Sequence, residues 1–530
     1  MSSLIKAALA LPATLLAAHL AVYLIDPYGL RRFPGPFLAK FTDAWLGYIS
    51  QQGHRSEVIH ALHLKYGPCV RISPSEVSVA SPEALQLVYA HGNGALKSTF
   101  YDAFVSIQRG LFNTRDRKQH TRKRKLVSHI FSQKSVLEFE PNISLYIDQL
   151  LIQWDRLFDS AVKGASGSEG EGGWVGRDGR LWLDLLPWTN YLAFDIIGDL
   201  AFGAPFGMIE AARDAAPVPA TESEVAFDSK DEAAVTYIPA VAVLNGRGEY
   251  SMSMGVLPAW VRPIMRKFPW YSKGLQDVKH LAGIAIVAVA KRLDGGPTDR
   301  VDLLSKLQQG KDDNGDPMGR PELTAEALTL LIAGSDTTSN STCAIIYYLA
   351  RNPAAQAKLH KELDEQLGTE DERVATSQQV KNLPYLDACI NEGLRLHSTS
   401  ALGLPRIVPE DGLTIDGNSF IPGAVLSVPS YTIHRDPEVW GLDVEAYRPE
   451  RWFEDDKKEL MNKTFNPYSV GPRACVGRNL ASLELQLIIA SILRRFHFVL
   501  EHPEEELQTR EGFLRKPLRC HVGIKRRDTL

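Results

Sequence analysis

A cysteine in a glycine-rich segment near the C-terminus carries the strongest chemical signal of the sequence. Cys475 follows Gly471 and precedes Gly477, and glycines let the backbone approach a flat ligand closely. Arg473 can neutralise a nearby carboxylate, and a helix predicted to begin near Asn479 favours negative charge on the sulfur. From these residues alone, a thiolate ligand and a buried structural cysteine both remain open.

A second candidate site lies in the middle of a long predicted helix, residues 322–351. Its centre reads Ala-Gly-Ser-Asp-Thr-Thr-Ser-Asn-Ser-Thr over residues 333–342, which is too polar for a membrane span. Mid-helix hydroxyls can compete for backbone carbonyls and bend a helix. We therefore expect this helix to cross a protein core and to turn Asp336 and Thr337 toward a cavity.

Three charged residues could form a buried ion-pair cluster. Glu392 and Arg395 are three residues apart, so they share one face of a helix, and Arg451 could reach the same carboxylate. The neighbours Ile390 and Leu394 favour burial. The alternative is a solvated surface pair, and either role is structural.

Residues 115–125 form a dense basic run. Such runs are usually solvated faces of helices. His120 and Arg124, however, are four residues apart and point the same way. The other lysines and arginines of the run could form a basic surface that steers an acidic protein partner.

Composition limits the class of protein. The chain has 530 residues, 44% of them hydrophobic, with no linker that divides it into halves. A net charge of −4 gives no support to nucleic-acid binding. The cysteines are odd in number and widely spaced, which favours a reducing compartment over a disulfide scaffold.

The N-terminus predicts a single transmembrane helix. Residues 7–25 are almost all apolar and have the length of a bilayer span. Lys6 precedes them and Arg31 and Arg32 follow, a weak indication that the bulk of the chain faces the cytoplasm. A cleaved signal peptide is the alternative. We assign residues 1–30 to the anchor and its flank, and residues 31–36, with Pro-Gly-Pro, to a stiff hinge.

The rest of the chain, residues 37–530, predicts one mainly helical domain with a small β portion. Helical periodicity covers residues 141–158, 185–202, 279–293, 322–351 and 480–496. Strand patterns cluster in residues 70–79 and 412–429. Residues 164–179, rich in Gly, Ser and Glu, and residues 211–234 predict exposed loops.

The Cys475 segment, the Asp336–Thr337 segment and the Glu392–Arg395 and Arg451 segments together resemble cytochromes P450, and they follow that family's order. The resemblance implies the cytochrome P450 fold behind the anchor, with haem b held by the Cys475 thiolate. The thiolate pushes electron density toward O–O cleavage. It also implies that Asp336 and Thr337 relay protons for that cleavage.

The resemblance also assigns the surroundings of the haem. It implies that His120, Arg124, Arg406 and Arg473 bind the haem propionates and that Gly471 belongs to the haem-binding loop. Tyr468 stands where the family usually has Phe, so a hydroxyl near the thiolate could alter the redox potential of the iron. The basic run would then dock a reductase.

Five further segments narrow the resemblance to fungal benzoate 4-monooxygenases: residues 100–106, 109–115, 191–199, 427–435 and 509–517. This implies para-hydroxylation of benzoate with O2 and with electrons from NADPH through a reductase. It also implies a monomer on the endoplasmic reticulum membrane.

Benzoate would need partners for its buried carboxylate. The candidates lie before the basic run: Lys97, Ser98, Thr99, Tyr101, Ser106 and Arg109. Apolar wall candidates are Leu402, Leu404 and Phe513.

Three other functions stay open at this point. The first is another fungal cytochrome P450 acting on a secondary metabolite or xenobiotic. The second is an oxygen-independent thiolate-haem isomerase or dehydratase, against which the Asp336–Thr337 pair argues. The third is a non-catalytic haem protein.

Overall fold

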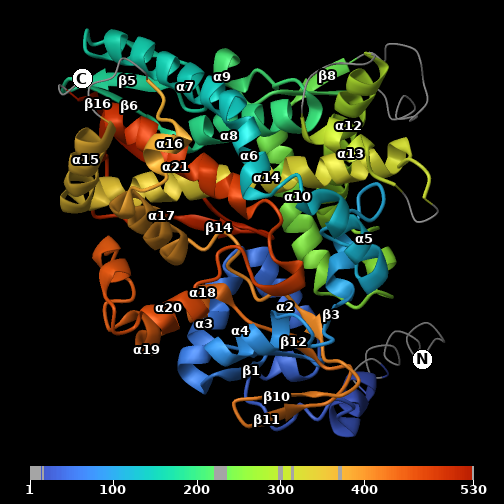
Figure 1. The fold of residues 1–530 in the computed structure, drawn as a ribbon. Coiled ribbons are helices and arrows are strands. Elements are labelled where there is room, and N and C mark those ends of the chain that lie inside the picture. The colour runs from blue at the N-terminus through green and yellow to red at the C-terminus, as the bar shows by residue number, and fades with distance from the viewer. Residues whose placement is uncertain are drawn as a thin grey trace, which may run out of the picture.

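The computed structural model describes residues 14, 17–219, 235–295, 302–311, 315–367 and 373–527. Helices fill most of the molecule, and two five-stranded sheets and three two-stranded ones complete it. Figure 1 shows most of the helices in the upper part, and one of the sheets together with α2, α3 and α4 in a smaller lower part, where the N-terminal residues meet strands from the second half of the chain. The predicted class, mainly α with a small β portion, is confirmed.

Helix α14 (Arg320–Arg351) crosses the middle of the helical part and packs against α8, α12, α17 and α21. Its hydroxyl-rich centre is buried in protein, as the polar sequence predicts. Ser335 donates to the carbonyl of Leu331 at 2.7 Å, so the helix backbone satisfies this buried hydroxyl.

The other α-helices of the described residues are α2 (Ala44–Gln52), α3 (Arg55–Tyr66), α4 (Pro82–Tyr89), α5 (Arg117–Ser128), α6 (Gln133–Val136), α7 (Glu140–Ala161), α8 (Leu185–Phe202), α9 (Met208–Ala211), α10 (Ala240–Gly255), α11 (Arg262–Met265), α12 (Pro269–Asp294), α13 (Leu303–Gln308), α15 (Pro353–Leu367), α16 (Ser377–Val380), α17 (Pro384–Leu396), α18 (Ser430–Ile433), α19 (Pro437–Trp440), α20 (Lys458–Thr464) and α21 (Arg478–Arg495).

The lower sheet has the strand order β1-β2-β12-β9-β3. Its register places Lys97 of β3 opposite Arg406 of β9, and Arg406 opposite Leu426 of β12. Residues far apart in sequence therefore bring two basic side chains to one sheet edge. The strands are β1 (Cys69–Arg71), β2 (Glu76–Val79), β3 (Leu96–Lys97), β9 (Arg406–Ile407) and β12 (Val425–Ser427), with the hairpin β10 (Leu413–Ile415) and β11 (Asn418–Phe420) beside them.

The upper sheet has the order β13-β16-β6-β5-β4 and overturns one prediction. Residues 164–179 are not a flexible loop, because they contribute β4 and β5. Trp174 is buried opposite Leu183 of β6, and its indole N–H donates to Glu169 at 2.8 Å. The strands are β4 (Ser166–Gly167), β5 (Trp174–Arg177), β6 (Arg180–Asp184), β13 (Phe496–Leu500) and β16 (His521–Arg526).

Two hairpins complete the described strands. Strand β14 (Thr509–Glu511) pairs with β15 (Arg515–Pro517), and β7 (Ala216–Pro219) pairs with β8 (Val235–Ile238). The loop predicted over residues 211–234 thus contains the end of α9 and β7, while residues 220–234 lie outside the described part.

About half of the predicted anchor, residues 7–25, lies outside the described residues, and its described part, residues 14 and 17–25, is helical. Within the described chain, no helix combines the length and the apolarity that a bilayer crossing requires. The predicted hinge is held against the domain. Phe33 stacks on Phe420 with ring centroids 5.1 Å apart, and the backbone N–H of Arg71 donates to Pro34 at 2.8 Å.

Candidate active site

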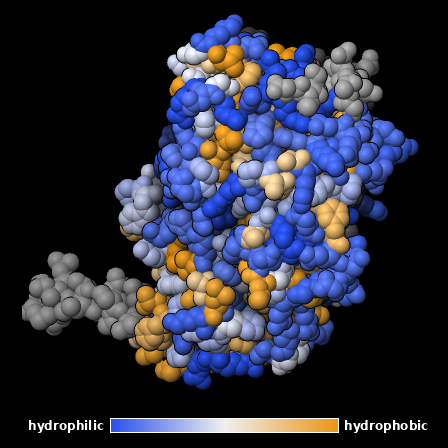
Figure 2. Space-filling model, turned by 90° about the vertical axis from the view of Figure 1, so that its left-hand side faces the viewer, coloured by the Kyte–Doolittle hydropathy of each residue, from blue (hydrophilic) through white to orange (hydrophobic). Residues whose placement is uncertain are grey.

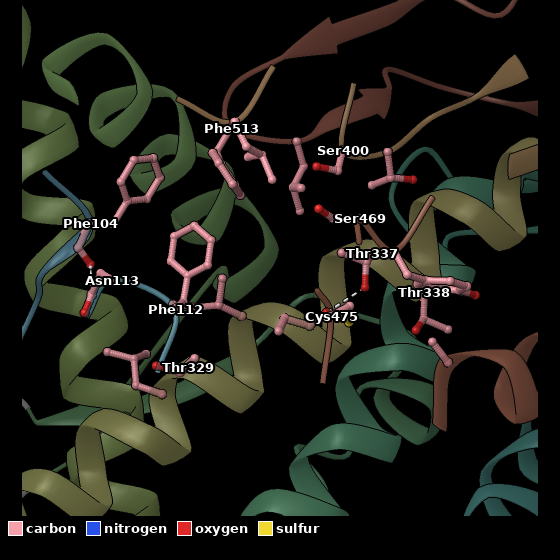
Figure 3. A pocket seen from close by; sticks show the side chains of 18 of the residues that line it. Phe104, Phe112, Asn113, Thr329, Thr337, Thr338, Ser400, Ser469, Cys475 and Phe513 are labelled. Carbon is pink, nitrogen blue, oxygen red and sulfur yellow. Dashed lines mark hydrogen bonds between the residues drawn. The ribbon is translucent and has the colours of Figure 1, made fainter. Parts of the chain in front are cut away.

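One cavity joins the Cys475 segment to the centre of α14. Figure 3 shows Cys475, Thr337 and Thr338 on one side of it and Phe104, Phe112 and Asn113 on the other. Of the five cysteines, all within the described residues, only Cys475 is exposed. Its thiol therefore faces a largely apolar space and is available as a ligand.

The loop around Cys475 is shaped by glycine and by the helix that follows. Gly471 has φ +75°, and a Cβ at this position would overlap the carbonyl oxygen of Tyr89, so only glycine fits. The backbone N–H of Cys475 donates to Tyr468 at 2.8 Å, and α21 begins three residues later. Burial raises the pKa of the Cys475 thiol, and the backbone of Gly477 and the charge of Arg124 partly oppose that rise. A bound metal ion would favour the thiolate outright.

Beside this loop lie five basic side chains, which we call the basic cluster: Lys97, His120, Arg124, Arg406 and Arg473. No carboxylate pairs with any of them within the described part of the chain. Burial and the neighbouring guanidinium groups lower the pKa of His120 to about 3, and they hold the pKa of Lys97 well below its usual range. Positive charge is therefore concentrated here without a counter-ion.

The N–H groups of the basic cluster are held by neutral acceptors. Arg124 donates to the carbonyl of Ala474, next to Cys475, at 2.5 Å. Arg473 donates to the carbonyl of Thr114 at 2.7 Å. Arg406 donates to the hydroxyl of Tyr101 at 2.6 Å, and Lys97 donates to the carbonyl of Phe112. These contacts fix the directions of the cations but do not neutralise them.

Asp336 and Thr337 take different positions on α14. Thr337 lines the cavity, and its hydroxyl donates to the carbonyl of Ala333 at 2.6 Å. Asp336 is buried behind the cavity wall and accepts from the amide of Asn340 at 2.9 Å. Burial raises the pKa of Asp336, while the charge of Lys516 opposes the rise. An acid that can hold a proton thus stands beside the alcohol of the cavity.

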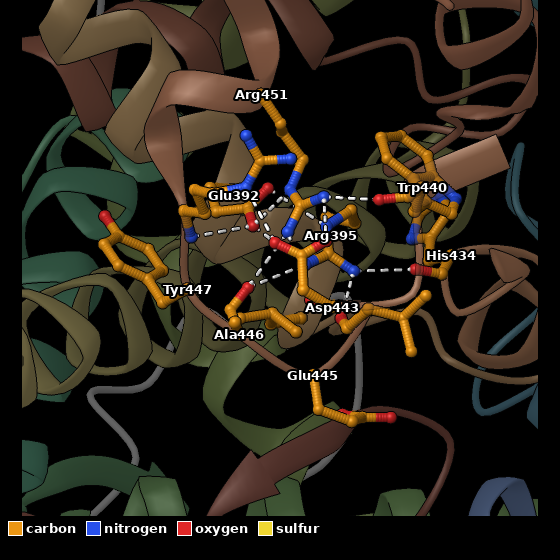
Figure 4. A network of polar contacts seen from close by, with 12 residues as sticks. Glu392, Arg395, His434, Trp440, Asp443, Glu445, Ala446, Tyr447 and Arg451 are labelled. Atoms are coloured by element: carbon orange, nitrogen blue, oxygen red, sulfur yellow. Dashed lines mark hydrogen bonds and ion pairs between the residues drawn. The ribbon is translucent and has the colours of Figure 1, made fainter.

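Glu392, Arg395 and Arg451 form the ion-pair cluster (Figure 4). Arg395 donates to both Glu392 oxygens, at 2.8 and 3.0 Å, and Arg451 donates to one of them at 2.8 Å. The side chains are at most 1% exposed, and the remaining N–H groups reach carbonyls such as that of His434. The cluster is paired within the chain and lies away from the cavity lining, which fits a structural role.

A family model described as Cytochrome P450 matches residues 34–523. The chain belongs to the cytochrome P450 family. It is 49% identical to benzoate 4-monooxygenase bphA of Aspergillus niger over 522 residues, which cover 96% of each chain. It is 31% identical to a cytochrome P450 monooxygenase of Penicillium roqueforti, over 89% of this chain and 84% of that one. It is 30% identical to cytochrome P450 monooxygenase gsfF of Penicillium aethiopicum, over 95% of each.

Membership in this family implies a haem with a cysteine thiolate ligand and the use of O2. The residues present fit that group. Cys475 offers an exposed thiol inside an apolar cavity, and the basic cluster lacks the anions that the two haem carboxylates would supply. Cys475 would hold the iron and the basic cluster the propionates. Tyr468 lines the same cavity with its hydroxyl 3.5 Å from that of Ser482.

The sequence-based substrate candidates divide into two groups. Ser106, Leu404 and Phe513 line the cavity. Ser98 and Tyr101 do not, because Ser98 accepts from the backbone N–H of Phe100 at the start of a 3-10 turn and Tyr101 accepts from Arg406.

Three further candidates also fall outside the lining. Arg109 is 41% exposed and pairs with Asp102 at 2.8 Å. Leu402 is buried in the core cluster that also contains Phe104 but does not itself line the cavity, and the carbonyl of Thr99 accepts from Arg262 at 2.9 Å. Position in the loop did not separate these residues from true wall residues, because the chain folds back on itself between residues 98 and 113.

The structure adds wall residues that the sequence did not indicate. Phe104, Phe112 and Phe513 pack edge to face with one another, with centroids 4.9 to 5.6 Å apart. Arg247 of α10 and Asn113 also line the cavity. Phe104, Phe112 and Asn113 lie in segments 100–106 and 109–115, which carry the family resemblance, but nothing in those segments marks them as wall residues. Arg247 lies outside every segment that the sequence singled out, so only the tertiary structure places it on the wall.

The basic run 115–125 contains residues that are paired within the domain and residues that are exposed to solvent. Arg115 pairs with Asp102 at 2.9 Å, and Lys123 is buried against Glu326 at 2.8 Å, so neither belongs to a free surface. Arg117, Lys118 and Lys125 are exposed on α5. The predicted basic surface is therefore smaller than the run itself.

Proposed function

We propose that this cytochrome P450 hydroxylates benzoate at the para carbon and yields 4-hydroxybenzoate. One atom of O2 enters the C–H bond, and the other leaves as water with two electrons from NADPH and two protons. The similarity to benzoate 4-monooxygenase bphA, 49% over 96% of each chain, carries this proposal. It far exceeds the similarity to the other two fungal monooxygenases, at 30% and 31%.

The bound haem would supply the activation of O2, and the Cys475 thiolate that would hold it would promote this activation. The side chains would supply protons and exclude water. Thr337 presents its hydroxyl to the cavity, and Asp336 behind it can recharge that hydroxyl because its pKa is raised. The charge of Lys516 lowers the pKa of Asp336, so this acid can also release its proton.

The cavity walls suit a single aromatic ring. Phe104, Phe112 and Phe513 form an edge-to-face set on the side remote from Cys475 (Figure 3). A small ring can pack against such faces and edges, while Leu404 and Leu485 complete an apolar enclosure.

We further propose that residues 7–25 anchor the protein in the endoplasmic reticulum membrane, with the domain in the cytoplasm. Hydrophobic side chains gather toward the lower left edge of the side shown in Figure 2, and Leu24, Ile25, Phe37 and Leu38 are exposed. An NADPH-dependent reductase would dock on Arg117, Lys118 and Lys125, and the enzyme would act as a monomer. Detergent, but not high salt, should release the protein from microsomes.

Reconstitution with a reductase, NADPH and benzoate tests the proposed reaction. The expected result is 4-hydroxybenzoate in proportion to NADPH consumed, and none from the Cys475→Ser variant, whose hydroxyl cannot replace the thiolate. Consumption of NADPH without phenol would overturn the choice of benzoate, and turnover without NADPH would indicate an isomerase or dehydratase instead.

A further inference from the structure

Arg247, in the middle of α10, is a buried cation on the cavity wall. Arg247 is only 6% exposed, and it lines the same cavity as Cys475. One terminal nitrogen donates to the carbonyl of Phe104 at 2.9 Å, and the guanidinium lies 5.5 Å from the centre of that ring. The Nε–H group is buried and has no partner among the described residues.

No carboxylate among the described residues pairs with Arg247. Burial alone lowers its pKa to about 10, so it stays protonated at neutral pH, and no charged group contributes to that shift. It is held apart from the arginines of the basic cluster, because it donates to the carbonyl of Phe104, whereas those arginines donate to Ala474, Thr114 and Tyr101. The haem carboxylates therefore do not account for this cation. A buried unpaired charge is costly unless a ligand pairs with it.

Two neighbouring groups extend the site. The hydroxyl of Ser106 lines the cavity, is buried and has no hydrogen-bond partner in the described chain. Asn113 donates its amide to the same Phe104 carbonyl at 3.0 Å, so this carbonyl holds Asn113 and Arg247 together. Figure 3 shows Asn113 and Phe104 across the cavity from Cys475.

We propose that Arg247 binds the carboxylate of a small aromatic acid, with the hydroxyl of Ser106 as a second donor. This inference rests on the proposed function and assigns its substrate class to aromatic monocarboxylates. The carboxyl group and the para carbon lie at opposite ends of a benzoate ring. An anchor on the far wall therefore turns the para C–H toward the Cys475 side, and the paired guanidinium nitrogens suit a carboxylate.

The test compares benzoate with benzamide, a neutral molecule of the same shape, by calorimetric titration of the haem-loaded protein. Arg247→Met should raise the Kd of benzoate about 30-fold or more, because it removes one partner of a buried charge pair, and should change the Kd of benzamide by less than about threefold. Arg247→Lys keeps the charge and should fall between Met and wild type. Arg109→Met is the matched control, since that arginine is paired with Asp102 outside the lining, and should leave both Kd values unchanged.

Equal losses for benzoate and benzamide in Arg247→Met, with wild type binding benzoate, would overturn the inference. If Arg247→Met does not retain haem, Arg247→Lys and Ser106→Ala carry the same comparison, and no selective loss of benzoate in either overturns it. Failure of the wild type to bind benzoate at all would instead refute the proposed function. The anchor would then be tested on naphthoate and cinnamate, and independence of their Kd from Arg247 would refute it as well.

Discussion

The ion-pair cluster and the basic cluster are both buried, but they treat charge in opposite ways. In the ion-pair cluster, the Glu392 carboxylate accepts from two guanidinium groups and from the indole of Trp452 at 3.1 Å. Backbone carbonyls accept the remaining guanidinium N–H groups shown in Figure 4. In the basic cluster, the side chains of Lys97, Arg124, Arg406 and Arg473 donate only to neutral acceptors within the described residues.

This difference separates a structural site from a binding site. A cluster that is paired within the chain stabilises the fold by itself, whereas a cluster of like charges destabilises it until a ligand of opposite charge arrives. Burial depresses the pKa of His120, and repulsion by the neighbouring cations depresses it further. On the opposite wall of the cavity, Arg247 is likewise a buried cation with no carboxylate partner in the described part of the chain.

The largest expected effect comes from opening the ion-pair cluster. Glu392→Ala would leave the buried guanidinium of Arg395 without a carboxylate and that of Arg451 with only Asp443, at 3.3 Å, and should cost about 3–5 kcal/mol of unfolding free energy. Denaturant unfolding of the haem-loaded protein measures this cost. Glu459→Ala is the control, because Glu459 and its partner Lys463 are 84% and 61% exposed, and it should cost at most about 1 kcal/mol. Equal costs for the two variants would show that the ion-pair cluster is not the stabilising element.

The second effect concerns the basic cluster without its haem. The folded-state pKa of His120 is about 3, below the value of about 6.5 expected for the unfolded chain. As pH falls from about 6.5 toward 3, the unfolded state binds the proton first, so stability is lost on acidification. In the haem-free protein this histidine should contribute a slope approaching about 1.4 kcal/mol per pH unit, which His120→Asn removes. The difference between the two proteins should shrink when haem is bound, and a slope unchanged by the substitution would contradict the repulsion.

The ion-pair cluster could be predicted from the sequence because half of it is local. Glu392 and Arg395 share a helix face by spacing alone, and apolar neighbours indicate burial. The anchor of the substrate could not be predicted, because Arg247 lies between two glycines in α10 and meets Phe104 only through tertiary packing. Loop candidates such as Arg109 have the right chemistry, but the fold turns that guanidinium toward Asp102.

Secondary structure shows the same division. The predicted helix 185–202 has the observed bounds of α8, because the periodicity of apolar residues within this segment is enough to indicate a helix. Strands β4 and β5 were missed, because glycine and serine favour loops and only the partner strand β6 makes that segment extended. Residue 496 was assigned to the last helix, but pairing with β16 makes Phe496 the start of β13.

A smaller effect is expected from Lys516, whose charge acts on the buried acid Asp336 without lining the cavity. Lys516 opposes the raised pKa of Asp336, so Lys516→Met should raise that pKa further and keep the acid protonated to higher pH. The pH dependence of hydroxylation should move upward, and product per NADPH should fall by roughly two- to tenfold at neutral pH. Lys525→Met, an exposed lysine on β16, is the control and should change neither quantity. If the pH dependence of hydroxylation is unchanged in Lys516→Met, the charge of Lys516 does not influence the pKa of Asp336.

The smallest effect belongs to the exposed part of the basic run, where solvent screens the charge. Lys125 on α5 is exposed, and its neighbour Arg124 reaches the Cys475 loop, so a reductase docked there would approach the haem side of the molecule. Lys125→Glu should raise the reductase concentration for half-maximal activity about two- to fivefold at low salt, and the difference should fade as ionic strength rises. Lys361→Glu is the control, because Lys361 is 76% exposed on α15, on the opposite side of the molecule in Figure 1. If both substitutions weaken the reductase equally, only net charge matters, and α5 is not the docking surface.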